Sequence, residues 1–421
     1  MHMSITSKAV GLIGGGIIIH DRSHNPPFVI YNPFNRKVGT AENYARQGTS
    51  IYKALKAAGC FDLNPPRWTE KSLSLATTEN CNCECIYCFE GINKTDCSMN
   101  LKTALKVIDD YLDSIENGQV PTIAFYGGEP TLNMSLLKEC VEHLRSREFN
   151  PSLSISTNGV MSEDSLTYLL QNRFYVALSI DGPPSIQDLH RPLKAGKGSS
   201  AIVEKTLRAL VKEKPPFHVR VTVTSLSVQK MPEIVEYFIN EGVENIHVEP
   251  VEITGACEDR HNLRPSVESF LDGFINASKI ATRHNAILQT VTLRYLKSGI
   301  TDHFCGTLAG HDKLYNVRGN PSLCHELLEE DEVLQFASRP DNIKVNYPIP
   351  HFLPIIKNKR SSCFSCYLKY ICGGTCPKQS WQETENHSEP SSWHCRLSQA
   401  LIPIVVSEIS QTTFSSNLHR G

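Results

Sequence analysis

Three cysteines lie close together near the end of the first quarter of the chain, at Cys81, Cys85 and Cys88, with the spacing C-x3-C-x2-C. Thiolates are the usual ligands of iron–sulfur clusters, and a 4Fe–4S cube generally takes four of them. Three thiolates leave one iron open to a small molecule. The spacing therefore indicates a reactive cluster rather than a closed electron-transfer site.

A second group of cysteines lies near the C-terminus and has the spacing C-x2-C-x5-C-x3-C. Its members are Cys363, Cys366, Cys372 and Cys376. Disulfide frameworks belong mostly to small secreted domains, which this chain of 421 residues does not resemble. Zinc also suits C-x2-C pairs, but it does not explain a three-thiolate loop without a nearby histidine. A non-enzymatic electron-transfer or zinc-binding protein remains an alternative at this point.

Composition excludes several other classes of protein. The net charge is −2 and the chain has no long basic run, so we expect no nucleic-acid partner. No apolar stretch is long enough to span a membrane. The apolar segment Ala9–Ile19 resembles the core of a signal peptide, but the run Gly14–Gly16 weakens a helix and no convincing cleavage site follows. We expect a cytoplasmic protein.

Strand-like and helical runs alternate regularly through the middle of the chain. The strand-like runs are Leu73–Ala76, Thr122–Tyr126, Leu153–Ser156, Tyr175–Ile180, Val219–Thr224 and Ile246–Val251. The helical runs lie near 101–116, 134–147, 163–171, 200–213, 229–241 and 265–284. Six β–α repeats predict parallel strands and a partial (β/α)6 TIM-like barrel, two repeats short of closure. The cysteine loop follows the first strand, at the edge where such folds place their chemistry.

The fold class is therefore α/β, with four expected parts. Residues 1–70 predict a small α+β element, with a strand at Phe28–Tyr31 and a helical stretch from about 42 to 58. Residues 71–300 predict the partial barrel. Residues 301–400 lose the β–α rhythm and hold seven cysteines, which predicts a region folded around metal. Residues 401–421 predict a C-terminal helix and tail.

The cysteine loop resembles that of the radical S-adenosylmethionine (radical SAM) superfamily, which reads C-x3-C-x-aromatic-C, and Tyr87 supplies the aromatic residue. In that family the open iron binds the amino and carboxylate groups of SAM. An electron from the cluster then splits SAM into methionine and a 5′-deoxyadenosyl radical. The resemblance implies a 4Fe–4S cluster on Cys81, Cys85 and Cys88, SAM as cofactor, and a reducing partner such as flavodoxin or ferredoxin.

Motifs after the later strands extend this resemblance to the SAM contacts. The family's GGEP motif, which holds the SAM amino group, is matched by Gly127, Gly128, Glu129 and Pro130. Ser179 and Arg191 match residues that contact the ribose and the carboxylate of SAM. Further candidates at strand ends are Ser156, Asn158 and Asp181. For these three, ordinary turn chemistry after a strand is the alternative.

The C-terminal region resembles the SPASM extension, a seven-cysteine pattern that implies two auxiliary 4Fe–4S clusters. By the family's interleaving, one cluster is held by Cys363, Cys366, Cys372 and Cys395. The other is held by Cys305, Cys324 and Cys376. Some relatives add a further cysteine where this chain has His311, followed by Asp312. The fourth site is therefore one of these two residues or is open, and a solvated loop histidine is the favoured interpretation of His311.

Radical SAM proteins with this extension mostly modify peptides or proteins. We expect maturation of a ribosomally made precursor peptide: hydrogen abstraction from a side-chain carbon, followed by a carbon–carbon or thioether cross-link. Residues 1–70 could bind the leader of that peptide by adding a strand to a sheet. The alternative is an anaerobic sulfatase-maturating enzyme, which forms formylglycine. That branch has an aspartate base directly after the cysteine that corresponds to Cys324, where this chain has His325. His325 could take a proton, although a structural role beside a cluster is favoured.

Overall fold

The fold is taken from a computed structural model of the whole chain. It describes residues 8–13, 16–21, 28–31, 38–41, 53, 57, 72–89, 96–115, 118–253, 263–293, 304–307, 312–322, 324–326, 363, 366–368, 372–384 and 390–418. The chain divides into two compact units. The larger comprises Thr69–Thr290 and Gly306–Phe352, and the other comprises Met1–Trp68, Val291–Cys305 and Leu353–Gly421. The four-part division expected from the sequence stays a prediction.

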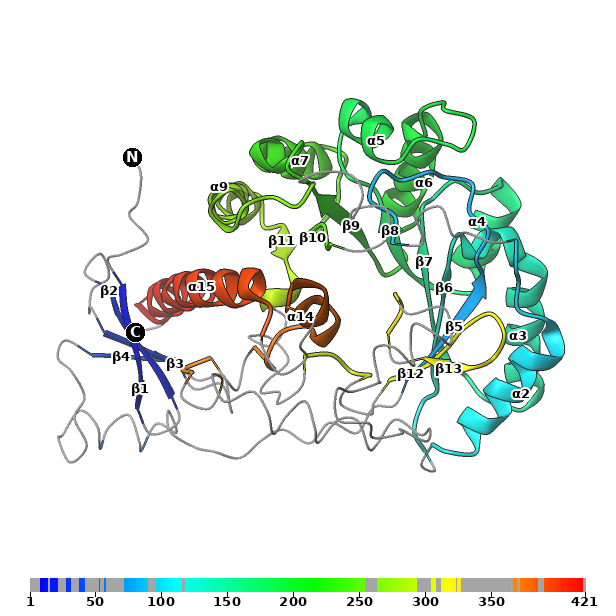
Figure 1. The fold of residues 1–421 in the computed structure, drawn as a ribbon, viewed down its shortest axis with the longest axis horizontal. Helices are drawn as coiled ribbons and strands as arrows, with labels where there is room; N and C mark the ends of the chain where they lie inside the picture. The colour runs from blue at the N-terminus through cyan, green and yellow to red at the C-terminus, as the bar shows by residue number, and fades with distance from the viewer. Residues whose placement is uncertain are drawn as a thin grey trace. The chain divides into compact units, whose positions relative to one another are not determined.

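The larger unit is built on a nine-stranded sheet with the order β11-β10-β9-β8-β7-β6-β5-β12-β13 (Figure 1). Its central strands are β5 (Ser72–Thr78), β6 (Thr122–Gly127), β7 (Ser152–Thr157), β8 (Tyr175–Ser179), β9 (Phe217–Val223) and β10 (Asn245–Pro250). Each pairs in parallel with the next. These are the six strands that the sequence predicts.

Three short strands extend this sheet beyond the six repeats. They are β11 (Ile287–Gln289), which pairs in parallel with β10, β12 (Asp312–Tyr315), which pairs in parallel with β5, and β13 (Pro321–Ser322), which is antiparallel to β12. The sheet therefore has additional strands at both edges but does not contain the eight β–α repeats of a closed barrel. This architecture agrees with the predicted partial barrel.

Helices connect the strands and cover the outer side of the sheet (Figure 1). They are α2 (Leu101–Leu112), α3 (Met134–Ser146), α4 (Glu163–Gln171), α5 (Pro184–His190), α6 (Ser200–Glu213), α7 (Met231–Asn240) and α9 (Val267–Arg283), with short 3-10 turns η3 (Pro130–Asn133) and η4 (Val228–Lys230). A further 3-10 turn, η5 (Val291–Leu293), belongs to the smaller unit. Capping residues fix where several helices begin. The side chains of Asn100, Ser162 and Ser266 accept backbone hydrogen bonds at the N-termini of α2, α4 and α9. Parallel strands in sequential order place their crossovers on one face, which leaves the other face as the lumen of the partial barrel.

Buried and exposed side chains alternate along the strands, and this alternation distinguishes the helix-covered face of the sheet from the lumen face. In β9 the side chains of Val219, Val221 and Val223 are fully buried. Arg220, between them in sequence, is exposed. Because successive side chains of a strand point to opposite faces, the valines pack under the helices and Arg220 faces the lumen. Each fully buried valine contributes roughly 1.5–3 kcal/mol to folding.

The smaller unit contains a four-stranded antiparallel sheet, β1 (Lys8–Ile13), β2 (Gly16–Asp21), β3 (Phe28–Tyr31) and β4 (Val38–Ala41), in that order. The segment that resembles a signal core thus forms strands β1 and β2. The strand predicted at Phe28–Tyr31 is present, whereas the predicted helical stretch at 42–58 lies almost wholly outside the described residues. Helix α14 (Pro377–Thr384) and the long helix α15 (Ser392–Leu418) follow, and α15 contacts β2, β3, β4 and η5.

Candidate functional site

The three-cysteine loop starts directly after β5, at the carboxyl edge of the sheet. Its backbone pairs with the segment that follows α5: Glu84 N–H donates to the Pro192 carbonyl at 2.8 Å, and Ile86 N–H donates to the His190 carbonyl at 3.0 Å. An isolated antiparallel bridge joins Cys83 to Leu193. The loop is therefore held by main-chain bonds to a region about a hundred positions later in sequence, at the place predicted for the reaction centre.

The chemistry of the three thiols fits an iron–sulfur cluster. Cys81 is buried, and Cys85 and Cys88 are partly exposed. Burial raises the pKa of Cys85 to about 12; the nearby Arg191 charge opposes this rise, whereas Cys88 and Cys81 add to it. Thiolates placed this close repel one another, so they need a cationic metal centre to ionise together. These residues would hold the open-iron cluster of a radical SAM protein.

The glycines of the GGEP segment fix the start of this loop. Gly127 has φ +137°, and a Cβ there would lie 2.2 Å from the Thr78 carbonyl oxygen. A Cβ on Gly128 would lie 2.4 Å from the Asn80 carbonyl oxygen. The close approach allows Gly128 N–H to donate to Thr78 at 2.8 Å and Glu129 N–H to donate to Asn80 at 2.8 Å. Glycine is required here because main chain packs on main chain.

Glu129 is fully buried, and its carboxylate is already surrounded by protein donors. Oε1 accepts from the backbone N–H of Thr131 at 3.0 Å, from the Thr131 hydroxyl at 2.7 Å and from the Thr157 hydroxyl at 2.8 Å. Oε2 accepts from the backbone N–H of Asn158 at 2.7 Å. Burial raises the pKa of Glu129 to about 7, against the effect of these donors. The side chain thus ties the end of β6 to the end of β7, and its predicted contact with the SAM amino group stays a prediction. Pro130, the last residue of the motif, begins η3 and is buried.

Asn158 supports the cysteine loop from the end of β7. Its Nδ2 lies 3.6 Å from Cys81 Sγ and donates to Asn82 Oδ1 at 2.7 Å. Its Oδ1 accepts from Val160 N–H at 2.8 Å, which is an Asx-type turn. Asn158 thus makes the turn that the sequence offers as an alternative to a SAM contact. The same turn orients the side-chain amide toward Cys81, a predicted cluster ligand.

Asp181 is the centre of a buried polar network just beyond β8. Its Oδ2 accepts a hydrogen bond from the Tyr87 hydroxyl and lies 3.2 Å from His190 Nδ1. Its Oδ1 accepts from Thr222 N–H at 2.9 Å. Burial opposes ionisation, but the Arg191 charge and the bonds from His190 and Tyr87 outweigh it and lower the pKa of Asp181 below its usual value. The carboxylate therefore connects the cysteine loop to β9 and to the end of α5.

Arg191 is paired within the protein. Its Nε lies 3.1 Å from Asp181 Oδ2, its Nη2 donates to the Thr222 hydroxyl at 3.4 Å, and its Nη1 lies 4.0 Å from Cys85 Sγ. The guanidinium also lies 5.3 Å from the centre of the Tyr87 ring. The structure places this arginine beside the predicted cluster, while its contact with the SAM carboxylate stays a prediction.

Two predicted residues, Ser156 and Ser179, lie at the ends of β7 and β8. By strand alternation both face the lumen, since Ile155 and Leu178 next to them are buried under the helices. Ser156 is exposed and Ser179 partly exposed. They are accessible to a ligand at this edge.

His325 packs against the lumen side of β6. Its ring meets Tyr126 edge-on, with the centroids 4.4 Å apart. The side chain is nevertheless exposed. Partial burial, together with the charge of Arg220, lowers the pKa of His325 below its usual value. An imidazole held neutral at neutral pH can accept a proton, so the geometry is compatible with either role considered for it.

Four cysteines of the smaller unit line one small cavity of about 40 Å³. They are Cys363, Cys366, Cys372 and Cys395. This is the ligand set that the SPASM resemblance implies for one auxiliary cluster, and Cys376 does not line the cavity. Four thiols around one space fit a 4Fe–4S cluster. In the described part of the chain, no three Cys, His, Asp or Glu side chains converge closely enough to hold a single metal ion.

The second auxiliary set is divided between the units. Cys305 and Cys376 belong to one unit and Cys324 to the other, so their assignment to one cluster stays a prediction. His311 lies outside the described residues. Asp312 begins β12, and its Oδ1 accepts from the Ser72 hydroxyl at 2.6 Å. That bond anchors β12 on β5 and leaves the role of Asp312 toward iron untested.

Sequence reasoning missed His190, Thr222 and Arg220. Polar and apolar residues alternate along Phe217–Val223. This pattern predicts that Arg220 and Thr222 face the lumen. His190 gave no such signal, because its role depends on Asp181 and on Thr224, whose hydroxyl oxygen lies 3.1 Å from His190 Nε2.

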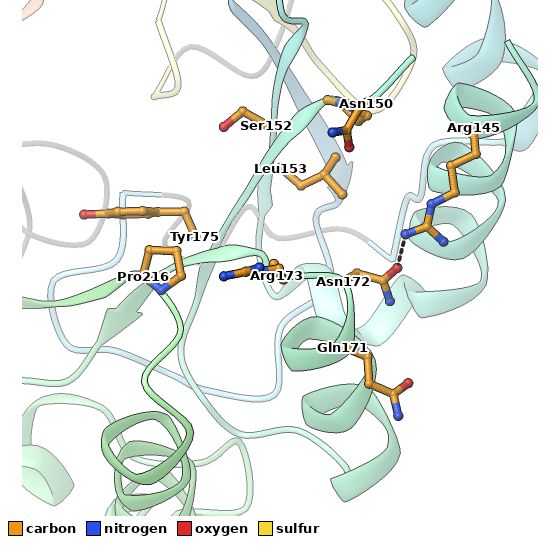
Figure 2. Close-up of a pocket in the computed structure, with 10 residues that line it drawn as sticks. Arg145, Asn150, Ser152, Leu153, Gln171, Asn172, Arg173, Tyr175 and Pro216 are labelled. Atoms are coloured by element: carbon orange, nitrogen blue, oxygen red, sulfur yellow. Dashed lines mark hydrogen bonds between the residues drawn. The ribbon is translucent and has the colours of Figure 1, made fainter. Parts of the chain in front are cut away.

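A cavity of about 410 Å³ lies at the opposite, amino-terminal edge of the sheet (Figure 2). Ser152 and Tyr175 begin β7 and β8 there, and Arg145 Nη2 donates to Asn172 Oδ1 at 2.5 Å across its rim. Active sites in such folds lie at the carboxyl edge of the sheet. We therefore assign the candidate site to the cysteine loop and not to this cavity.

Comparisons with known sequences agree with this location. Residues 75–238 match the model of the radical SAM superfamily. An uncharacterized protein of Methanocaldococcus jannaschii is 32% identical over 260 residues, which cover 61% of this chain and 85% of that protein. A cysteine-type anaerobic sulfatase-maturating enzyme of Clostridium perfringens is 26% identical over 247 residues, covering 51% of this chain and 64% of the enzyme.

Solved structures show the same fold at lower identity. Native anSMEcpe with bound AdoMet and the Cp18Cys peptide superposes with a TM-score of 0.65 at 18% identity, covering 82% of this chain and 99% of that chain. Streptococcus suis SuiB bound to the precursor peptide SuiA has a TM-score of 0.56 at 14% identity, covering 92% of this chain and 100% of that chain.

Membership in an enzyme superfamily excludes the alternative of a non-enzymatic electron-transfer or zinc-binding protein. It implies a 4Fe–4S cluster and SAM as cofactors. No helix in the described residues is long and apolar enough to cross a membrane. With its cysteine loop, GGEP segment and strand order together at one edge of a partial barrel, the chain belongs to the radical SAM superfamily.

Proposed function

We propose that the protein is a peptide maturase that abstracts a hydrogen atom from a side-chain carbon of a precursor peptide and installs an intramolecular cross-link. The observation that carries the proposal is the open, polar lumen at the cysteine-loop edge. Ser156, Arg220 and His325 are all exposed on it, although they lie on an inward-facing surface. An accessible polar lumen suits an extended peptide better than a small apolar substrate.

The residues of this chain have separate tasks in the proposed site. Cys81, Cys85 and Cys88 would hold the SAM-binding cluster, which supplies the hydrogen-abstracting chemistry when it is bound. Asn158 and Asp181 orient the loop that carries these thiols. Radical chemistry needs such rigid support, because a misplacement of about 1 Å can cost two orders of magnitude in rate.

Two auxiliary clusters complete the proposed cofactor set of three. One would be held by the four cysteines that line the small cavity of the smaller unit. The other would be held by Cys305, Cys324 and Cys376. Forming a cross-link removes two hydrogen atoms from the peptide, so an electron acceptor is required besides SAM. Auxiliary clusters of this kind are suited to that role.

Leader binding is proposed for the antiparallel sheet β1–β4. Among the described strands, β1 and β4 are its edges, because each pairs with a single neighbour. An edge strand presents unpaired main-chain groups that an extended peptide can join. Support for a peptide substrate comes also from the neighbours whose solved structures contain the Cp18Cys peptide and SuiA.

The test is incubation of the reconstituted, reduced enzyme and SAM with short peptides encoded next to its gene. The proposal expects a product lighter by two hydrogen atoms, with the linked residues resistant to separation in tandem mass spectra. A peptide that is bound and remains unmodified while SAM is consumed would contradict it.

Formylglycine formation is the second candidate, because the sulfatase-maturating relative matches over half of this chain. Oxidation of a serine also removes two hydrogen atoms, so mass alone does not separate the two functions. A hydrazide probe does, since it captures an aldehyde and leaves a cross-link unchanged. His325 in place of the expected aspartate favours the cross-link.

A further inference from the structure

Arg220 lies on the lumen face of β9, and none of the ion pairs among the described residues includes it. It pairs in register with Ser179 of β8 and with His247 of β10, so it lies on an interior strand of the sheet. The described part of the chain places no carboxylate within ion-pair distance of its guanidinium. Two other arginines of the unit, by contrast, have carboxylate partners: Arg191 lies 3.1 Å from Asp181, and Arg208 lies 3.0 Å from Glu241.

The surroundings of Arg220 are basic. His218 lies two positions before it on the same face, and its pKa is lowered to about 4 by burial, by His247 and by the Arg220 charge. Tyr175 Oη lies 3.1 Å from His218 Nδ1. His247 pairs in register with Arg220, and its ring centre lies 5.8 Å from that of His218. Two imidazoles and one guanidinium therefore face the same space.

The carboxylates on this part of the lumen already have partners within the protein. Glu249 Oε1 lies 2.5 Å from His247 Nε2, and its Oε2 accepts from the Thr290 hydroxyl at 3.2 Å. Asp181, at the end of β8, is held by Tyr87 and Arg191. Within the described residues, the charge of Arg220 therefore has no carboxylate to pair with. On the lumen of a partial barrel such a charge attracts an anion more strongly than at an open surface.

We infer that Arg220, flanked by His218 and His247, binds a carboxylate of the substrate peptide. A planar guanidinium matches a carboxylate with two parallel hydrogen bonds, which fixes orientation as well as position. Arg220 lies in the strand row of Ser179, below the edge that carries the cysteine loop. A carboxylate held there would position the neighbouring residues of the peptide toward that edge. The inference rests on the proposed function, because it names the chemistry of the same substrate.

The carboxylate has two possible sources, an Asp or Glu side chain or the C-terminus of the peptide. The experiment is affinity selection of a randomised peptide library on the anaerobically reconstituted enzyme with SAM, with no reductant added. One arm uses peptides with a free C-terminus and the other uses C-terminal amides. Enrichment of Asp and Glu in both arms assigns the side chain, and enrichment in the free-acid arm alone assigns the C-terminus.

Arg220→Gln should reduce the enrichment on the order of tenfold, because it removes a charge-assisted contact. Arg220→Lys, which keeps the charge without the bidentate geometry, should give an intermediate value. Arg208→Gln is the matched control, since Arg208 lies on exposed α6 and should leave the enrichment unchanged. Circular dichroism of each variant separates loss of binding from loss of fold.

Wild-type selection without any preference for carboxylates, or an enrichment that Arg220→Gln leaves intact, overturns the inference. A weaker SAM affinity in Arg220→Gln with unchanged peptide enrichment also overturns it, because Arg220 would then serve the cofactor. SAM cleavage by the same preparations after reduction is measured separately. Its failure in the wild type counts against the proposed function, whereas normal cleavage by a wild type that shows no carboxylate preference counts against the inference alone.

Discussion

The hydroxyl of Tyr87, in the cysteine loop, donates a hydrogen bond to the carboxylate of Asp181, 94 positions later at the end of β8. Asp181 is fully buried and also pairs with Arg191. The aromatic residue of the C-x-aromatic-C motif is therefore an anchor that attaches the loop to the sheet. The position of the three thiols depends on a carboxylate that belongs to a different motif.

Asp181→Asn should weaken this anchor. The change leaves Arg191 buried without its negative partner, which costs roughly 3–5 kcal/mol of unfolding free energy. Tyr87→Phe removes only one hydrogen bond and should cost about 1–2 kcal/mol. Urea unfolding of the apoprotein measures both.

Asp164→Asn, in the exposed first turn of α4, is the control and should change stability little. The electron paramagnetic resonance signal of the reduced three-thiolate cluster should be altered in Asp181→Asn and unaltered in Asp164→Asn. Equal stability and identical spectra for the wild type and Asp181→Asn would contradict the anchoring role.

Cys372→Ala should remove one auxiliary cluster. Four thiols line the cavity, and a 4Fe–4S cube loses most of its affinity when one ligand is replaced. Iron analysis after reconstitution should show about four fewer iron atoms per chain than the wild type. Cys140→Ala, a buried cysteine of α3, should leave the iron content unchanged. Equal iron in wild type and Cys372→Ala would mean that the cavity holds no cluster.

The sequence alone allowed the six central strands and their helices to be predicted, because hydrophobic periodicity repeats clearly between Leu73 and Val251. It also allowed prediction of which four cysteines belong together in the smaller unit, because the spacing follows a family pattern. The partners of Glu129 and Asp181 could not be predicted in the same way. Those contacts join strand ends that are far apart in sequence, and only the register of the sheet brings them together.

Glu129→Gln should reveal a pH-dependent contribution to stability. The pKa of Glu129 is raised to about 7, above its unfolded value, so the stability it contributes is complete below about pH 4.5. That stability is lost as the pH rises through 7, when the buried carboxylate ionises. Glutamine does not titrate. The difference in unfolding free energy between wild type and Glu129→Gln should therefore fall by on the order of 3 kcal/mol between pH 4.5 and 8.

Urea unfolding at these two pH values measures the difference. Glu163→Gln, at the exposed start of α4, is the control and should show a far smaller pH dependence. If the difference for Glu129→Gln stays constant with pH, its four hydrogen-bond donors keep the carboxylate ionised throughout.

His325→Phe should separate packing from proton transfer. Phenylalanine keeps the edge-on contact with Tyr126 but cannot accept a proton. If His325 is the base, product formation should fall on the order of a hundredfold while SAM cleavage continues. If it is structural, the variant should retain product formation, and His325→Ala should lose it together with thermal stability. Liquid chromatography of peptide product and 5′-deoxyadenosine from one reaction distinguishes the two roles.

The arrangement of the lumen was the part of the site least accessible to sequence reasoning. His218 and Arg220 were visible as polar residues of a strand, yet their relation to His325 depends on a segment about a hundred positions away. Tertiary packing, rather than local pattern, decides which charges share one space.

The most direct test of the central claim is the formation of 5′-deoxyadenosine by the anaerobically reconstituted, dithionite-reduced protein after addition of SAM. Wild type should produce 5′-deoxyadenosine and methionine, whereas Cys88→Ala should produce neither above background. Cys97→Ala, which replaces a nearby cysteine outside the three-thiolate spacing, should behave as wild type. Background levels from the wild type, or equal yields from wild type and Cys88→Ala, would contradict the assignment of Cys81, Cys85 and Cys88 as the reaction centre.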